Sequence, residues 1–232
     1  MKNTETAARK INRTEIVFIL DRSGSMSGLE PDTIGGFNSL IARQQQEAGE
    51  CRLTTVLFDD RYELLHDRVD LKKVRPITER EYWVRGSTAL LDAIGRTIHH
   101  VGNTQKYALP QHRADKVLVV ITTDGMENAS REYDIGRIRE MITRQQEKYG
   151  WEFLFLGANI DAVETAGRFG IAPDRAADYH ADSEGTALNY KTVSDAVSHM
   201  RACGEIQPGW NAPIAADFEQ RGGRTSTRLP RR

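Results

Sequence analysis

Three short segments, far apart in the chain, carry oxygen-bearing side chains in a pattern that suits a metal ion. The first is Asp21–Ser25 (DRSGS), the second is Gly86–Thr88 (GST), and the third is Thr123–Gly125 (TDG). Carboxylate and hydroxyl oxygens are ligands of hard cations such as Mg²⁺, which needs few direct protein ligands because it retains several waters. The five candidate metal-binding residues are Asp21, Ser23, Ser25, Thr88 and Asp124.

The alternative for each segment is an ordinary turn. Asp, Ser and Thr side chains often cap the helix that follows them. Asp21 or Ser25 could cap a helix that begins near Pro31, and Ser87 or Thr88 could cap the next one. Each segment alone fits either interpretation, so the decision depends on whether the three segments meet in space.

The hydrophobic pattern predicts strands that would position these segments. Glu15–Leu20, Lys116–Thr123 and Trp151–Leu156 are apolar with little alternation, which is typical of strands covered on both faces. Amphipathic helices are predicted between them, and Tyr62–Val69 is predicted as an antiparallel partner of Cys51–Phe58. This order predicts an α/β fold: a Rossmann-like open, mostly parallel sheet with one antiparallel edge strand and helices on both faces. Right-handed crossovers place the strand-to-helix loops on one edge, so the three segments are expected to converge.

The chain is predicted to form one domain with two short appendages. Residues 1–13 are a polar lead-in, residues 14–203 form the α/β domain, and residues 204–232 are predicted to be a disordered, basic C-terminal tail. From Arg221 onward the tail carries five arginines and no acidic residue. Trp210 is an aromatic residue in this polar segment, and one hypothesis is that it serves as a docking anchor.

Composition is that of an ordinary globular protein. The 232 residues have a formal net charge of −1, which argues against nucleic-acid or membrane-surface binding as the main activity; the basic tail is the one segment that would contact nucleic acid. Cys51 and Cys203 fit no metal-binding or redox spacing, which favours a reduced chain. The N-terminus lacks the apolar core of a secretion signal, and no apolar run reaches the roughly 20 residues that span a bilayer. The predicted location is the cytoplasm.

The three segments, taken together and in this order, resemble those of the von Willebrand factor type A (VWA) domain over roughly residues 14–202. The resemblance implies a metal-ion-dependent adhesion site (MIDAS), in which Ser23, Ser25 and Thr88 are metal ligands while Asp21 and Asp124 hold the ion largely through bound water. It also implies a protein partner that offers a Glu or Asp carboxylate to the ion. The expected ion is Mg²⁺, with Mn²⁺ or Ca²⁺ as alternatives. Lacking a signal peptide, the chain looks more similar to stand-alone bacterial members of the family, including those associated with tellurite resistance, than to secreted adhesins.

Three functions remain open at this stage: a metal-dependent protein-binding module, a metal-dependent hydrolase or phosphotransfer component, and a structural scaffold with a vestigial site. A phosphatase of the haloacid dehalogenase type needs a second carboxylate where this chain has Ser23. A serine hydrolase needs glycines on both sides of its nucleophile, but Ser23 and Ser27 occupy those positions around Ser25. These patterns favour a binding module over an enzyme.

Two further features lie outside the metal pattern. Asp59 and Asp60 follow a predicted strand and are expected to form an exposed turn, or otherwise to add acidity near the edge of the site. Trp83 precedes the second segment, and it either borders the binding surface or packs inside the protein.

Overall fold

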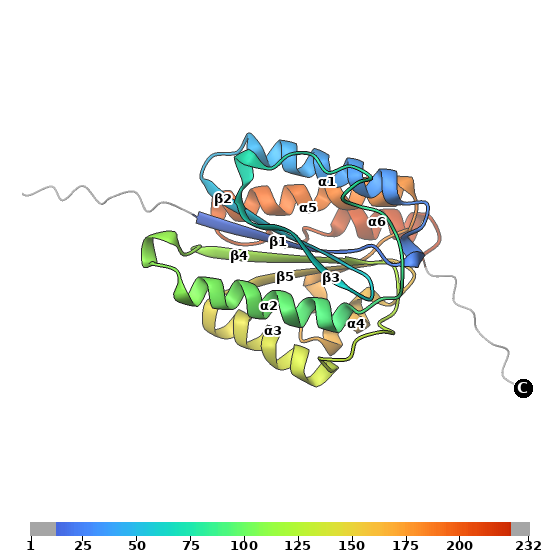
Figure 1. Cartoon of the computed structure of the whole chain (residues 1–232). Helices are drawn as coiled ribbons and strands as arrows, with labels where there is room; N and C mark the ends of the chain where they lie inside the picture. Colours follow the sequence, from blue (N-terminus) through green and yellow to red (C-terminus); the bar gives the residue numbers. More distant parts are fainter. Residues whose placement is uncertain (1–12, 224–232) are drawn as a thin grey trace, which may run out of the picture.

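The computed structural model describes residues 13–223 as one sheet with helices on both faces (Figure 1). The sheet has six strands in the order β3-β2-β1-β4-β5-β6. All neighbouring pairs are parallel except β2 and β3, which are antiparallel, so the predicted sheet type and edge strand are confirmed. The strands are β1 (Arg13–Asp21), β2 (Glu50–Phe58), β3 (Tyr62–Asp70), β4 (Lys116–Thr123), β5 (Glu152–Gly157) and β6 (Ala176–Asp178). The predicted lead-in lies almost entirely outside the described residues, as does the end of the predicted tail from residue 224 onward.

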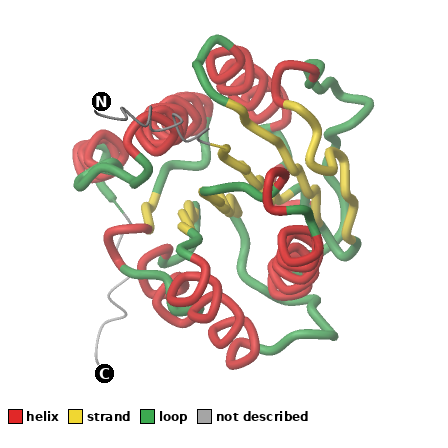
Figure 2. Tube along the Cα trace, turned by 90° about the vertical axis from the view of Figure 1, so that its left-hand side faces the viewer, coloured by secondary structure: helices red, strands yellow, loops and turns green. Residues whose placement is uncertain are grey.

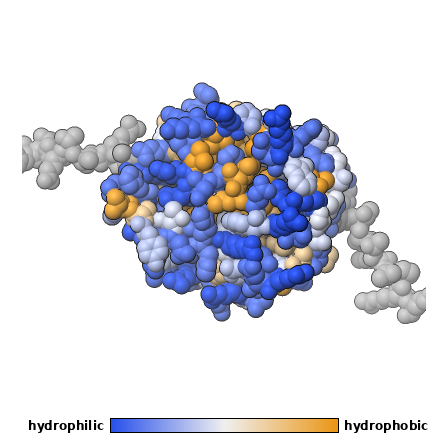
Figure 3. All heavy atoms as spheres, viewed as in Figure 1, coloured by the Kyte–Doolittle hydropathy of each residue, from blue (hydrophilic) through white to orange (hydrophobic). Residues whose placement is uncertain are grey.

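Helices form two layers, one on each face of the sheet, and Figure 2 shows the twisted sheet between them. Helices α1, α5 and α6 cover one face, and α2, α3 and α4 cover the other (Figure 1). Hydrophilic residues cover most of the side seen in Figure 3, with a group of hydrophobic residues near its centre. The helices are α1 (Glu30–Gln45), α2 (Leu90–Tyr107), α3 (Ile135–Tyr149), α4 (Ala162–Arg168), α5 (Ser183–Cys203) and α6 (Ala212–Gln220).

The central strand β1 explains why this sequence forms a sheet that is buried on both faces. Successive side chains of a strand point to opposite faces. Phe18 and Leu20 belong to the hydrophobic core beneath α1 and α5, whereas Val17 and Ile19 belong to the core above α2 and α3. All four side chains are fully buried. The nearly uninterrupted apolar run in the sequence therefore supplies both cores at once.

The order of the strands creates a crevice between the carboxyl ends of β1 and β4. The chain first builds outward from β1 to β2 and β3, and then returns to place β4 on the other side of β1. Such a reversal of direction is where open α/β sheets bind ligands. Leu20 pairs with Thr122, so Asp21 and Thr123 leave the sheet side by side.

Residues 205–223 correct the prediction of a disordered tail. This segment contains helix α6, and Trp210 is only 2% exposed within the core beneath α5. The indole Nε1 of Trp210 donates a hydrogen bond to the carbonyl oxygen of Asp174 at 2.8 Å. The hypothesis of Trp210 as a docking anchor is therefore replaced by a core role. The segment has too few apolar residues to show the periodic pattern that predicts a helix. Ile206 and Ile214 nevertheless pack in the core.

No helix in the described part of the chain, residues 13–223, has the length and apolar character needed to cross a membrane.

The substitution Trp210→Ala is expected to lower the free energy of unfolding by about 3–5 kcal/mol, because it leaves a large cavity and an unpaired carbonyl oxygen. Urea unfolding followed by circular dichroism measures this change. The control is Tyr107→Ala at the end of α2, where the side chain is 75% exposed and the expected change is within about 0.5 kcal/mol. Equal effects of the two substitutions would show that residues 205–223 do not support the domain.

Candidate metal centre

All five predicted metal-site residues meet at the carboxyl edge of β1 and β4. Asp21 is the last residue of β1, and Asp124 follows the last residue of β4. Ser23 and Ser25 lie in the loop after β1, which makes one short 3₁₀ turn, and Thr88 lies just before α2. The predicted convergence of the three segments is thus observed.

The hydroxyl groups of the site point toward one another and toward Asp124. The Oγ atoms of Ser23 and Ser25 are 3.0 Å apart, and Ser25 Oγ donates a hydrogen bond to Asp124 Oδ1 at 2.5 Å. A Cβ atom added to Gly125 would lie 3.0 Å from Ser25 Oγ and 3.2 Å from Thr88 Oγ1. Gly125 therefore lets both hydroxyls approach one point beside the Asp124 carboxylate.

The residues present fit a hard divalent cation. Asp124 is 2% exposed, and its Oδ2 atom is buried without a hydrogen-bond partner among the described residues. A buried carboxylate oxygen without a donor is costly, and a bound cation would supply the missing partner. Ser25 is exposed, so the site also has a side open to solvent. Within residues 13–223 no three His, Cys, Asp or Glu side chains form a metal cluster, so this site depends on its hydroxyls as well as its carboxylates.

Asp21 is held from both sides and orients the first loop. Its Oδ1 accepts a hydrogen bond from the backbone N–H of Ser23 at 2.7 Å, and its Oδ2 accepts one from Thr123 Oγ1 at 2.6 Å. The Tyr82 hydroxyl donates to the carbonyl oxygen of Asp21 at 2.6 Å. With both carboxylate oxygens engaged in this way, Asp21 is suited to hold an ion through water and to fix the loop.

Burial raises the pKa of both carboxylates. Desolvation raises the pKa of Asp21 to about 6, against the opposing hydrogen bonds from Thr123 and Ser23, and the nearby charge of Asp124 raises it further. Desolvation likewise raises the pKa of Asp124, while the hydrogen bond from Ser25 opposes this shift. Two acids of raised pKa at one point indicate a site that lacks positive charge.

The backbone of Thr88 is bonded to the loop that follows β4. Its N–H donates to Asn128 Oδ1 at 2.9 Å, and its carbonyl oxygen accepts from the N–H groups of Asn128 at 3.0 Å and Ala129 at 3.2 Å. These bonds set the distance between the second and third metal-site segments.

Neither helix is capped in the way that the turn interpretation proposed. The N-cap of α2 is Ala89 and makes no side-chain cap bond; instead Glu127 Oε2 accepts a hydrogen bond from the N–H of Leu91 at 2.9 Å. The N-cap of α1 is Leu29, also without a side-chain bond. The hydroxyl and carboxylate groups of the three segments are therefore not used as helix caps.

Asp59 joins the first and second segments through a buried ion pair, a structural role that the sequence pattern did not show. It is fully buried, and its Oδ2 accepts hydrogen bonds from Arg22 Nε at 3.0 Å and Arg85 Nε at 2.6 Å. Its carbonyl oxygen accepts from the N–H of Ala89 at 2.8 Å. Burial alone would raise the pKa of Asp59, but the hydrogen bonds from Arg85 and the Arg61 N–H and the Arg22 charge lower it below its usual range.

The expected exposed turn at Asp59 and Asp60 is thus corrected, because Asp59 lies inside and holds the metal-site loops. The signal in the sequence was its place directly after a buried strand. Gly86 adopts a positive φ of 66°, and a Cβ atom there would lie only 2.4 Å from Asp60 Oδ1. The positive φ favours glycine at this position, and any other residue would also have to displace the exposed Asp60 carboxylate.

Trp83 borders the site at the surface. Its side chain is 43% exposed, and the guanidinium carbon atoms of Arg85 and Arg22 lie 4.5 Å and 5.5 Å from the centre of its ring. This exposure excludes a core role, and the contacts show that Trp83 packs against the two loops that carry Arg22 and Arg85.

Solved structures of VWA proteins share this arrangement of strands and helices at low sequence identity. A von Willebrand factor type A protein from Catenulispora acidiphila has a TM-score of 0.57 and 12% identity, covering 81% of this chain and 43% of its own. This chain has the VWA fold. Proximal thread matrix protein 1 from the mussel byssus, in a structure with a zinc-occupied MIDAS motif, has a TM-score of 0.54 and 16% identity over 81% of this chain and 46% of its own. The pilus adhesin SpaC from Lactobacillus rhamnosus GG reaches a TM-score of 0.62 at 10% identity, over 82% of this chain and 30% of its own.

This chain therefore spans less than half the length of each of these three proteins. No protein-family model and no curated protein sequence matches it. At these identities the comparisons establish the VWA fold, and the metal site must be argued from the geometry of this chain.

Mg²⁺ is expected to raise the melting temperature of the VWA domain more at about pH 7.5 than at about pH 5. Because the pKa of Asp21 is raised from 3.8 to about 6, the folded metal-free protein holds this proton more tightly than the unfolded chain does. The domain therefore loses stability as the pH rises from 3.8 to about 6, and the cost persists above that range. At pH 7.5 a bound cation offsets the free-energy cost of burying the ionised Asp21 carboxylate. At pH 5 protons compete with the cation for that carboxylate.

Thermal unfolding with excess MgCl₂ or EDTA, at both pH values, measures this difference. The variant Asp21→Asn cannot ionise at this position and is expected to reduce the pH dependence of the metal effect, with the remainder due to Asp124. An equal Mg²⁺ effect at both pH values in the unmodified protein would contradict the assignment of Asp21 to the site.

The substitution Asp59→Ala is expected to cost about 3–5 kcal/mol of stability, because it leaves the buried guanidinium of Arg22 without its main partner. The control is Asp60→Ala, which removes an exposed carboxylate and is expected to change stability by about 0.5 kcal/mol or less. The double variant Asp59→Ala/Arg22→Met should recover part of the loss, since it no longer buries an uncompensated charge. Urea unfolding measures all three, and a double variant no more stable than Asp59→Ala would refute the ion-pair explanation.

Proposed function

We propose that this chain is a metal-ion-dependent protein-binding module. Ser23, Ser25 and Thr88 bind a divalent cation directly, and Asp21 and Asp124 hold it through water. The ion is Mg²⁺, and a protein partner completes its coordination with a Glu or Asp carboxylate. The single observation that carries this proposal is the buried, unpartnered Oδ2 of Asp124 beside three converging hydroxyl groups.

The open side of the site is consistent with the binding of a partner protein. Ser25 and Asp124 line an open cavity of about 430 Å³ at this edge of the sheet, together with Asp32, Asn159 and Asp182. When bound, the cation supplies a positive centre at which an incoming carboxylate oxygen can coordinate. Neutral hydroxyl ligands leave more of the ion's charge available than carboxylate ligands would, and this favours an anionic partner group.

A binding role is favoured over hydrolysis by the residues around the site. The described residues that line this cavity include no His, Cys or Lys. The Asp32 carboxylate accepts a hydrogen bond from Ser183 Oγ at 2.7 Å, and Asp182 Oδ1 accepts from the Gly185 N–H at 2.8 Å. Asp32 and Asp182 thus have structural partners, and the remaining acid of the lining, Asp124, is the one assigned to the ion. The proposed partner is a cytoplasmic protein, following the location predicted from the sequence.

Metal binding is the first test. Isothermal titration of the EDTA-treated and dialysed protein with MgCl₂ or MnCl₂ is expected to show one site per chain. Ser25→Ala and Thr88→Ala each remove a direct ligand and are expected to weaken binding by about tenfold or more, which is about 1.4 kcal/mol. Ser39→Ala, on the exposed side of α1, is the matched control and should bind normally. Unchanged affinity in both site variants would contradict the proposed ligand set.

Partner binding is the second test. The immobilised protein is used to capture proteins from a cell extract in MgCl₂ and in EDTA, and captured proteins are expected to be lost in EDTA and with Thr88→Ala. Capture that persists in both would support the scaffold alternative. Turnover of p-nitrophenyl phosphate that requires Mg²⁺ and disappears in Asp124→Ala would support the hydrolase alternative.

A further inference from the structure

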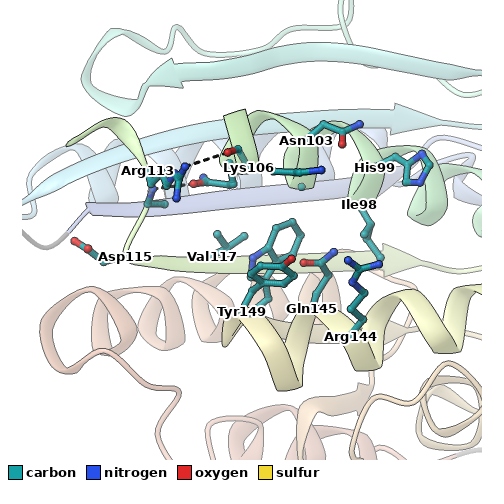
Figure 4. A pocket seen from close by; sticks show the side chains of 14 residues that line it. Ile98, His99, Asn103, Lys106, Arg113, Asp115, Val117, Arg144, Gln145 and Tyr149 are labelled. Carbon is teal, nitrogen blue, oxygen red and sulfur yellow. Dashed lines mark hydrogen bonds between the residues drawn. The ribbon is translucent and has the colours of Figure 1, made fainter. Parts of the chain in front are cut away.

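A second cavity lies at the opposite end of the sheet from the metal centre. It has a volume of about 430 Å³ and lies between the C-terminal halves of α2 and α3 (Figure 4). Its lining includes Val117, near the start of β4, and Trp151, just before β5, so it lies at the amino edge of the strands. This volume is within the range of pockets that hold small organic molecules.

The floor of this cavity is apolar. Ile98, Val117 and Trp151 line it, and each of these side chains is at most 5% exposed. The cavity remains open partly because α2 has a glycine in its wall: a Cβ atom at Gly102 would meet only Gln145 Nε2, at 3.6 Å. The floor is therefore aromatic and aliphatic, although each of these side chains exposes only a small area to the cavity.

The walls are polar and carry an excess of positive charge. Figure 4 shows Asn103 and Lys106 of α2 on one wall, with Arg144, Gln145 and Tyr149 of α3 on the other. Arg113 is a third cationic residue of the lining, and Asp115 is its one acid.

The three cationic side chains have no carboxylate partner. Arg113 donates to the carbonyl oxygens of Ala108 at 2.9 Å and Lys106 at 3.1 Å, and Lys106 Nζ lies 5.0 Å from the centre of the Tyr107 ring. Within residues 13–223 none of Lys106, Arg113 and Arg144 forms a salt bridge. With these three cationic residues and Asp115 as its one acid, the lining of the cavity carries a net positive charge.

The geometry points to a binding site for a small organic anion between α2 and α3. Its flat apolar body packs on Trp151 and Val117, and its carboxylate or phosphate group lies between the walls that carry Lys106 and Arg144. A neutral apolar ligand would leave the cationic side chains unused, and a simple inorganic anion would leave the apolar floor exposed to water. The combination of floor and walls therefore selects a molecule with both parts. This site is separate from the metal centre and does not depend on it.

Fluorescence titration of the full chain with 8-anilinonaphthalene-1-sulfonate, an aromatic anion, tests the site. Saturable binding is expected, and Gly102→Leu should weaken it by about tenfold or more by filling the cavity. Leucine is compatible with this helix and its Cβ atom makes no close contact, so the fold should be retained, as circular dichroism can verify. The matched control is Gly167→Leu on α4, where an added Cβ atom has nothing within 4 Å; it should bind normally.

Charge is tested by Lys106→Gln/Arg144→Gln, which should weaken binding of the sulfonate and also reduce its dependence on salt. The neutral analogue N-phenyl-1-naphthylamine should bind about tenfold or more weakly than the sulfonate. Benzoate and phenyl phosphate, added as competitors, distinguish a carboxylate ligand from a phosphate ligand. Binding that is unchanged in both Gly102→Leu and the double variant, or equal affinity for the neutral analogue, would overturn the proposal.

Discussion

The candidate site depends on one constraint: the fold buries two carboxylates next to each other. They lie at the ends of the neighbouring strands β1 and β4. Asp21 and Asp124 are at most 2% exposed, and burial raises the pKa of each. Asp21 finds donors in the Ser23 N–H and the Thr123 hydroxyl, but one oxygen of Asp124 has none among the described residues. The fold therefore holds negative charge in a place where only a cation or a proton can compensate it.

The loops around these acids are held together before any ligand arrives. Asp59 bonds Arg22 of the first segment and Arg85 beside the second, while Asn128 bonds the backbone of Thr88 from the third loop. Such bonds fix the positions of the hydroxyls, so an ion would not have to order them on binding. Gly125 serves the same end, because a side chain there would press on the hydroxyl groups of both Ser25 and Thr88.

The two ends of the sheet offer different chemistry to ligands. At the carboxyl edge, carboxylates and hydroxyls surround an open cavity suited to a cation and then to an anionic partner group. At the amino edge, the cavity between α2 and α3 is apolar below and cationic around its walls. Gln105 lines this second cavity and also donates a hydrogen bond to the buried Glu15 of β1, whose Oε2 also pairs with Arg68 at 3.0 Å. The hydrogen bond from Gln105 to Glu15 thus connects the α2 wall of this cavity to the central strand β1.

The sequence by itself determined the sheet type, the antiparallel edge strand and the five residues of the candidate site, since apolar runs and the polar residues directly after them are local patterns. It could not show that β1 and β4 are neighbours, because strand order depends on how distant segments pack. The sequence also did not reveal that Asp59 is buried or that residues 205–223 are folded. A single acid in a turn and isolated apolar residues form no periodic pattern from which burial could be predicted. Only the tertiary structure decided these features, along with the cavity between α2 and α3, because each depends on contacts between residues far apart in the chain.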